Sequence, residues 1–184
     1  MIHRGRVDPA LAARWAAALG DGPSRRLDDA LSYLPFVGER PPGADRLLAS
    51  QCWVRHGDPA HHWHQDGALH HDFRAPAAPL PLWTCWIALT RCGDDAPGLE
   101  WAEPSPDDLL APDQLTDAAV RARFTTLHRP RLEPGDALWF DGRLVHRTAV
   151  AGPRRRTSIE LRFVPDGPLP ARLAGETVQS IGRA

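Results

Sequence analysis

The stretch Pro134-Gly135-Asp136-Ala137-Leu138-Trp139-Phe140-Asp141-Gly142-Arg143-Leu144-Val145-His146 contains two turn signals around one short apolar run. Pro-Gly-Asp at its start and Asp-Gly in its middle both favour tight turns, because proline presets one backbone dihedral and glycine accepts the left-handed region. The apolar run at 137–140 favours a β-strand, and a second strand is expected at 145–150. The stretch therefore predicts two strands joined by a short turn.

Four more runs are rich in aromatic and β-branched residues, and they lie at residues 47–55, 83–90, 125–132 and 157–164. Six short strands separated by turns are typical of a meander or a jelly roll. The 19 prolines and 15 glycines also favour many turns over a long helical bundle. We therefore expect a mainly β fold.

Helices are expected to flank the strands. Asp8 and Pro9 form a helix start, and apolar residues recur at helical spacing from there until Gly20. A second helix is expected from Ser24, with an apolar stripe that ends before Pro35 and consists of Leu27, Ala30, Leu31 and Leu34. A polar, helix-prone segment at 105–124 is expected to be an insertion between two strands.

A chain of 184 residues is expected to form a single domain with one core. Its expected layout is N-terminal helices at 1–45, a β core at 46–164 that contains the helical insertion, and a C-terminal tail at 165–184.

Composition excludes several classes of partner. The formal charge is −1 and the isoelectric point is about 6.7, so there is no basic surplus to neutralise a nucleic-acid backbone. No apolar run approaches the roughly twenty residues of a membrane span. Cys52, Cys85 and Cys92 are an odd set without a closely spaced pair, which favours a reducing cytoplasm over a disulfide framework. A small molecule is the expected partner, and the sequence allows a monomer or a homodimer.

Histidines crowd the segment that follows the first expected core strand. His64 and Asp66 form a His-x-Asp pair, and on a strand two side chains at this spacing would project the same way. His146 lies 82 residues further on. Two imidazoles and one carboxylate on one side of a metal, with the other positions open, is the ligand set of non-heme Fe(II) oxygenases.

Rival metal patterns occur in the same segment. His70-x-Asp72 is a second His-x-Asp, and His62-x-His64 is a His-x-His. The cupin pattern needs a glutamate shortly after its His-x-His, but no carboxylate stands at that place after Asp66. The alternative hypothesis is a non-oxygenase, cupin-like metalloprotein, either an isomerase or a binding module.

Five segments resemble, in order, the phytanoyl-CoA dioxygenase-like family of Fe(II)- and 2-oxoglutarate-dependent oxygenases. They lie within residues 47–164 and comprise Trp63-His64-Gln65-Asp66, Trp86-Ile87-Ala88-Leu89, Gly98-Leu99-Glu100, the opening stretch that ends at His146, and Arg156-Thr157-Ser158. The resemblance implies a double-stranded β-helix, which is a jelly-roll, cupin-like barrel, with helices on its flank. It also implies His64, Asp66 and His146 as the iron ligands.

The same resemblance implies a site for 2-oxoglutarate. Arg156 lies ten residues beyond His146, where the family keeps the arginine that binds the distal carboxylate. Arg154 or Arg155 could also point inward, but Arg156 is favoured because it begins an alternating strand. Ser158 shares a face with Arg156 and Thr148 shares one with His146, so both could donate to the cosubstrate. Trp86 could contact the cosubstrate or pack in the core.

The substrate side is defined less sharply. Gln51 and Arg55 lie on an expected neighbouring strand and could point into the pocket or occupy an edge. His70 lies in the expected loop over the mouth, where it could meet substrate or be exposed, as could the neighbouring His61, His62 and His71.

The implied reaction is hydroxylation of a small metabolite or biosynthetic intermediate of secondary metabolism by Fe(II), 2-oxoglutarate and O2, with release of succinate and CO2. Asp66 favours hydroxylation over halogenation, because related halogenases have a small residue at the carboxylate position. Desaturation, cyclisation and epimerisation share the same chemistry, so the sequence leaves the outcome and the substrate open.

Overall fold

The computed structural model describes residues 2–57, 61–74, 78–149 and 152–181, and it describes side chains from residue 7 onward within these ranges. Its strands pair in an antiparallel manner in two sheets. The main sheet has the order β1-β8-β5-β10-β3-β11, with β4 also beside β10 and β2 beside β4. The small sheet has the order β7-β6-β9.

The strands of the main sheet are β1 (Ile2–Arg6), β2 (Arg25–Arg26), β3 (Arg46–Leu47), β4 (Trp53–His56), β5 (Trp83–Ala88), β8 (Asp136–Asp141), β10 (Thr157–Val164) and β11 (Gln179–Ser180). Those of the small sheet are β6 (Gly98–Glu103), β7 (Thr126–His128) and β9 (His146–Ala149). The helices are α1 (Pro9–Leu19) and α2 (Asp117–Arg123), with short 3-10 helices η1 (Ala30–Phe36), η2 (Ala49–Gln51), η3 (Asp66–Ala68), η4 (Pro112–Leu115) and η5 (Ala171–Leu173).

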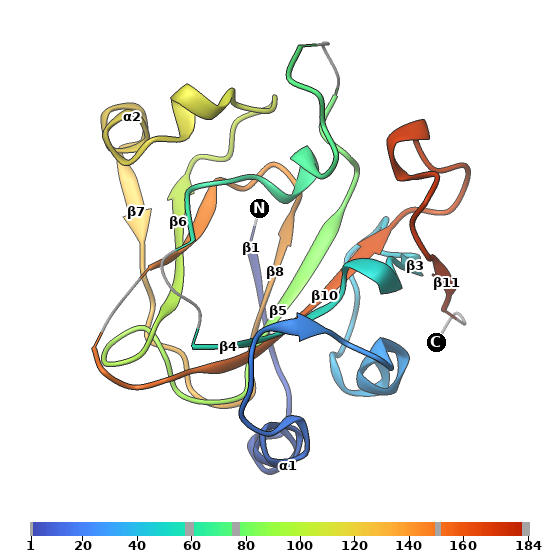
Figure 1. The fold of residues 1–184 in the computed structure, drawn as a ribbon, viewed down its shortest axis with the longest axis vertical. Helices are drawn as coiled ribbons and strands as arrows, with labels where there is room; N and C mark the ends of the chain where they lie inside the picture. The colour runs from blue at the N-terminus through green and yellow to red at the C-terminus, as the bar shows by residue number, and fades with distance from the viewer. Residues whose placement is uncertain (1, 58–60, 75–77, 150–151, 182–184) are drawn as a thin grey trace.

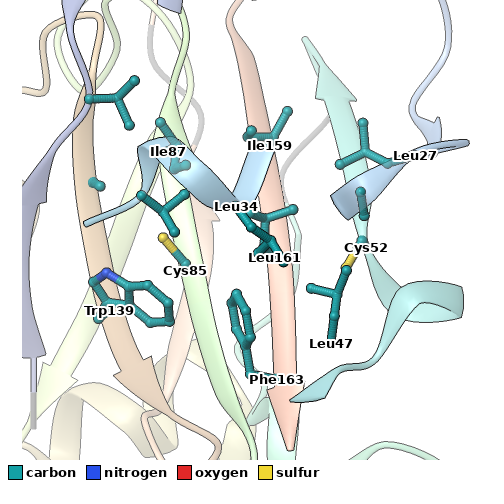
Figure 2. Packing of buried hydrophobic residues seen from close by; sticks show 14 of the residues in the cluster. Leu27, Leu34, Leu47, Cys52, Cys85, Ile87, Trp139, Ile159, Leu161 and Phe163 are labelled. Atoms are coloured by element: carbon teal, nitrogen blue, oxygen red, sulfur yellow. The ribbon is translucent and has the colours of Figure 1, made fainter. Parts of the chain in front are cut away.

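One face of the main sheet packs in a hydrophobic core, and the other faces the small sheet. Along β10, Ile159, Leu161 and Phe163 join a core with α1, η1 and alternate residues of the neighbouring strands. Figure 2 shows these side chains gathered on one face of the sheet together with Leu27 and Leu34. Because side chains alternate along a strand, the intervening residues of β10 face the small sheet. That face carries the candidate site.

Helix α1 forms as expected from its sequence. Asp8 caps its first turn, since the carboxylate accepts a hydrogen bond from the backbone N–H of Leu11 at 2.9 Å. Gly20 ends it with a φ of +64°, which favours glycine. Figure 1 shows α1 at one end of the molecule and α2 beside β7 at the other, where the helical insertion at 105–124 was expected.

The prediction of a second helix that begins at Ser24 is wrong. The Ser24 hydroxyl accepts the backbone N–H of His56, and Arg25 and Arg26 pair with β4 instead of starting a helix. Helical structure begins only at Ala30, as the 3-10 helix η1 with Pro35 inside it. An available strand edge outweighs helical periodicity here, because it satisfies the same backbone groups.

The strand boundaries also differ from the expectation. The run at 47–55 is interrupted by η2, so it forms two strands, β3 and β4. Strands β1, β6 and β11 were not expected, and β1 and β11 lie in segments assigned to helices and to a tail. The other expected strands form, although the last residue of the one at 145–150, Val150, lies outside the described residues.

None of the helices within the described ranges combines the length and the apolar character that a bilayer crossing requires.

Candidate metal centre

A cavity of about 310 Å³ lies between the two sheets and contains the candidate ligands on its wall. Strands β4, β5, β8 and β10 of the main sheet contribute to it, as do β6 and β9 of the small sheet. Its lining residues are Arg55, His61, His64, Gln65, Asp66, Ala68, Leu69, Thr84, Trp86, Leu99, Phe140, His146, Thr148, Glu160 and Arg162.

His64 and His146 are direct neighbours across a β-bridge, although they are 82 residues apart in sequence. Each donates its backbone N–H to the other's carbonyl, at 2.9 and 3.0 Å, and the ring centroids are 4.2 Å apart. The bridge extends the small sheet by one position beside β9. It fixes both imidazoles on the same wall of the cavity.

The two rings are oriented by backbone carbonyls. His64 Nδ1 lies 2.8 Å from the carbonyl oxygen of His62, and His146 Nδ1 lies 3.0 Å from that of Leu144. A carbonyl only accepts, so each Nδ1 must be the protonated nitrogen and each Nε2 carries a lone pair. Metal-binding histidines are commonly held in this way.

His64 and Asp66 project into the same cavity, as expected, because the backbone of Gln65 between them is extended. The extended segment ends there, however, since Asp66 begins the 3-10 helix η3. The Asp66 carboxylate is positioned by two donors from the main sheet. Arg162 donates to Oδ1 at 2.7 Å, and the Thr84 hydroxyl donates to Oδ2 at 2.6 Å.

The electrostatics favour the protonation states that a metal needs. Burial and the neighbouring His146 lower the pKa of His64 to about 3, so its imidazole is neutral near pH 7. Burial alone would raise the pKa of Asp66, but Arg162, the two histidines and the Thr84 hydrogen bond hold that pKa well below its usual range. A neutral imidazole and an ionised carboxylate are the forms that ligate metals.

Ligand atoms of His64, Asp66 and His146 all lie within 4.8 Å of one another. His64 Nε2 is 3.8 Å from Asp66 Oδ1, which is a separation that one ion between them can bridge at ordinary bond lengths of roughly 2 Å. These three residues therefore fit a divalent metal ion.

The rival metal patterns do not converge in this way. His62 is exposed, and the Asp72 side chain accepts the backbone N–H of Arg74. His70 binds Glu176 at 2.6 Å and not Asp72.

The three arginines at 154–156 differ in burial. Arg154 and Arg155 are exposed, and they contact Asp95 and the carbonyl of Gly22. Arg156 is only 1% exposed. Its guanidinium lies 5.5 Å from the Trp86 ring and donates to the Thr148 hydroxyl at 3.2 Å.

Trp86 and Thr148 line the cavity, whereas Arg156 and Ser158 are buried and are not among its lining residues. Trp86 also packs in the core between the sheets. The buried Ser158 hydroxyl finds no hydrogen-bond partner within the described residues.

The three residues considered for substrate contact have different surroundings. Arg55 lines the cavity and pairs with Glu160 through two contacts of 3.3 Å. Gln51 and His70 are not among the lining residues. Both bind the carboxylate of Glu176 in the C-terminal segment, at 2.8 and 2.6 Å.

Four residues around the site were missed from sequence: Thr84, Glu160, Arg162 and Glu176. A signal existed for two of them, because the alternation that starts at Arg156 and Ser158 continues to Glu160 and Arg162. Nothing local identifies Thr84 or Glu176, since their partners lie 18 and more than 100 residues away.

Two glycines bring the ligand segments together. Gly67 follows Asp66, and its N–H donates to the carbonyl of Gly142 at 2.7 Å. A Cβ at Gly67 would lie 2.7 Å from that carbonyl oxygen, and one at Gly142 would lie 2.9 Å from Gly67 Cα. The turn between β8 and β9, which contains Gly142, therefore lies at backbone contact distance from η3, which contains Asp66.

No family model matches the sequence, and no curated protein matches it either. Solved structures do match. EctD from S. alaskensis in its apo form is 18% identical with a TM-score of 0.53, and the match covers 66% of this chain and 46% of EctD. The chain thus spans less than half the length of EctD. EctD has also been solved with bound Fe, and with 2-oxoglutarate and 5-hydroxyectoine.

SnoN, a non-heme α-ketoglutarate-dependent epimerase from nogalamycin biosynthesis, covers more of the chain. In its complex with Fe3+, α-ketoglutarate and nogalamycin RO it is 16% identical with a TM-score of 0.62, over 89% of this chain and 78% of SnoN. ThoJ, a non-heme monooxygenase, is 14% identical with a TM-score of 0.51. At these identities the comparison establishes a fold shared with EctD, SnoN and ThoJ.

Proposed function

We propose that this chain is an Fe(II)- and 2-oxoglutarate-dependent dioxygenase that hydroxylates a small metabolite, and that it forms one such domain. The observation that carries the proposal is the convergence of His64, Asp66 and His146 within 4.8 Å on the wall of one cavity. Two histidines and one carboxylate leave open positions on an iron ion for a chelating cosubstrate and for O2.

The strand order supports a double-stranded β-helix. Part of the main sheet runs β4-β10-β5-β8, and the small sheet with its added bridge runs His64-β9-β6-β7. Two facing four-membered sheets of this kind form a jelly roll. The phytanoyl-CoA dioxygenase-like family has this fold, and the motif order of the sequence favours it among the families that share the fold.

The protein's own part at the metal is to hold three ligands in fixed states. His64 and His146 would bind through Nε2, because the carbonyls of His62 and Leu144 occupy both Nδ1 positions. Asp66 would supply the anionic ligand. Iron bound here with 2-oxoglutarate and O2 would supply oxidation of an unactivated C–H bond, with succinate and CO2 as coproducts.

Arg156 is the proposed partner of the distal 2-oxoglutarate carboxylate. Its planar guanidinium suits a carboxylate, and Trp86 and Thr148 hold it in a buried position. The buried Ser158 hydroxyl is available as a further donor on the same side.

A small substrate is favoured by the size and polarity of the cavity. The volume of about 310 Å³ must accommodate cosubstrate and substrate together. Arg55 and Glu160 give one wall the capacity to hydrogen-bond polar groups. EctD bound to 5-hydroxyectoine and SnoN bound to nogalamycin RO are neighbours in fold that hold small molecules. Since SnoN is an epimerase, the product must be identified by experiment.

The test is an anaerobic titration of the protein with Fe(II) and 2-oxoglutarate, observing the weak visible charge-transfer band of the iron chelate. We expect the band in the wild type and its loss in His64→Ala. Arg46→Lys is the control, because Arg46 lies in β3, away from the cavity, where it contacts the carbonyls of Pro165 and Gly167.

A wild type without the band would contradict the oxygenase. Metal binding without any effect of 2-oxoglutarate would instead favour a cupin-like metalloprotein, either an isomerase or a binding module.

A further inference from the structure

Asp66 lacks the support that the other two candidate ligands have. His64 and His146 are held by paired backbone hydrogen bonds of a β-bridge, whereas Asp66 begins a three-residue 3-10 helix. The orientation of its carboxylate therefore depends on side-chain contacts. Within the described residues these contacts come from Arg162 and Thr84.

Arg162 is itself held rigidly. The residue is 8% exposed, and its guanidinium donates to the Gln51 carbonyl at 3.2 Å as well as to Asp66 Oδ1 at 2.7 Å. Glu160 lies 3.6 Å from the same NH2 group. Three acceptors around one planar group fix both its position and its direction.

Thr84 and Arg162 are paired residues on adjacent strands. They are direct partners in the register of β5 and β10, so their side chains leave the same face of the main sheet side by side. Thr84 holds Oδ2 while Arg162 holds Oδ1. Oδ1 is also the oxygen 3.8 Å from His64 Nε2. The two donors thus determine which carboxylate oxygen is directed toward His64.

We propose that Arg162 and Thr84 are positioning residues that lock the Asp66 carboxylate so that Oδ1 alone is presented to the metal. This inference rests on the proposed metal site but adds two residues to it. Arg162 balances the negative charge of the ligand, and Thr84 prevents the carboxylate from rotating to offer both oxygens. The small sheet supplies the histidines, and the main sheet orients the carboxylate.

The experiment is a titration with Co(II) alone, without 2-oxoglutarate or O2, observed through the visible d–d absorption that reports coordination. The variants are Arg162→Met, Arg162→Lys and Thr84→Val, with Arg46→Met as the matched control for loss of a partly buried arginine. We expect Co(II) affinity to fall roughly 10- to 100-fold in Arg162→Met and Thr84→Val, with a changed absorption spectrum. Arg162→Lys should recover part of the affinity, and Arg46→Met should match the wild type.

Each outcome separates the two proposals. A wild type that binds Co(II) no better than His64→Ala would overturn the metal site, and the positioning proposal would fall with it. Normal binding in the wild type, with unchanged affinity and spectrum in Thr84→Val and Arg162→Met, would overturn the positioning proposal alone. If Arg162→Met does not fold, Thr84→Val decides, because it removes one hydrogen bond and no charge.

Discussion

Arg156 and Arg162 lie six residues apart, just before β10 and near its end, and their side chains contact different residues of the cavity wall. Arg162 contacts the candidate ligand Asp66, whereas Arg156 contacts Trp86 and Thr148. The proposed roles at the residue scale follow from this separation. One arginine orients a metal ligand, and the other is placed for the cosubstrate.

Replacement of Arg156 tests the cosubstrate role directly. Arg156→Gln should raise the dissociation constant for 2-oxoglutarate at least tenfold, because charged hydrogen bonds contribute about 1.5–3 kcal/mol each. Fe(II) affinity measured without 2-oxoglutarate should stay unchanged. Arg155→Gln is the control, since Arg155 is exposed and donates to the backbone carbonyl of Gly22. Equal 2-oxoglutarate affinity in Arg156→Gln and wild type would refute the assignment.

At the element scale, the site depends on how closely two turns approach each other. Gly67 and Gly142 meet at backbone distance, so η3 and the turn between β8 and β9 are locked together. Asp66 and His146 lie on either side of this contact. Local backbone packing therefore sets the distance between two ligands.

An added methyl group at this contact should separate the ligand segments. Gly67→Ala should lower stability by about 1–3 kcal/mol through overpacking, because its Cβ would lie 2.7 Å from the Gly142 carbonyl oxygen. Co(II) affinity should fall with it. Gly22→Ala is the control, since nothing lies within 4 Å of its added Cβ. Wild-type melting and metal binding in Gly67→Ala would show that the contact is not needed.

Glu176 in the C-terminal segment binds both η2 and the turn that contains His70. Ser50, Gln51 and His70 all contact its carboxylate. Burial alone would raise the pKa of Glu176, but these hydrogen bonds lower it to about 2 from its usual 4.5. A depressed folded-state pKa means that the contribution to stability is complete above about pH 4.5 and is lost as the pH falls toward 2.

Substitution of Glu176 should remove that pH dependence. Glu176→Gln should melt at a lower temperature than the wild type at pH 7, and the difference should shrink between pH 4.5 and 2. Thermal unfolding across this range, with the exposed Glu39→Gln as control, measures it. A difference that stays constant with pH would mean that the carboxylate charge contributes nothing.

At the scale of the whole molecule, the candidate metal site connects two sheets. His64 and His146 extend the small sheet, while Asp66 is held by β5 and β10 of the main sheet. An ion bound by all three would link both layers. Metal binding should therefore stabilise the folded chain as well as support chemistry.

Thermal unfolding with and without Co(II) measures this link. At a free metal concentration of about 100 times the dissociation constant, the wild type should gain roughly 2.7 kcal/mol, or about 5–10 °C in melting temperature. His146→Ala should gain little. Mg2+ is a useful comparison, because it prefers oxygen ligands over imidazole. An unchanged melting temperature in the wild type would argue against a site that spans the sheets.

Sequence alone indicated the mainly β class, helix α1 and most of the strands. These depend on local signals: alternation along a strand, a capping carboxylate and a turn glycine. The three candidate ligands were singled out from rival histidine patterns by the family resemblance and not by local spacing. Strands β1, β6 and β11 were not predicted, because their backbone pairing is supplied by partners elsewhere in the chain. The second helix failed for the same reason.

Only the tertiary structure decided how those residues meet. It placed Asp66 on a 3-10 turn held by Thr84 and Arg162, buried Arg156 while leaving Arg154 and Arg155 exposed, and engaged Gln51 and His70 with Glu176. Local patterns specify which face of an element a side chain takes. Contacts between residues 96 or 106 positions apart depend on sheet register and on the path of distant segments, which no local pattern encodes.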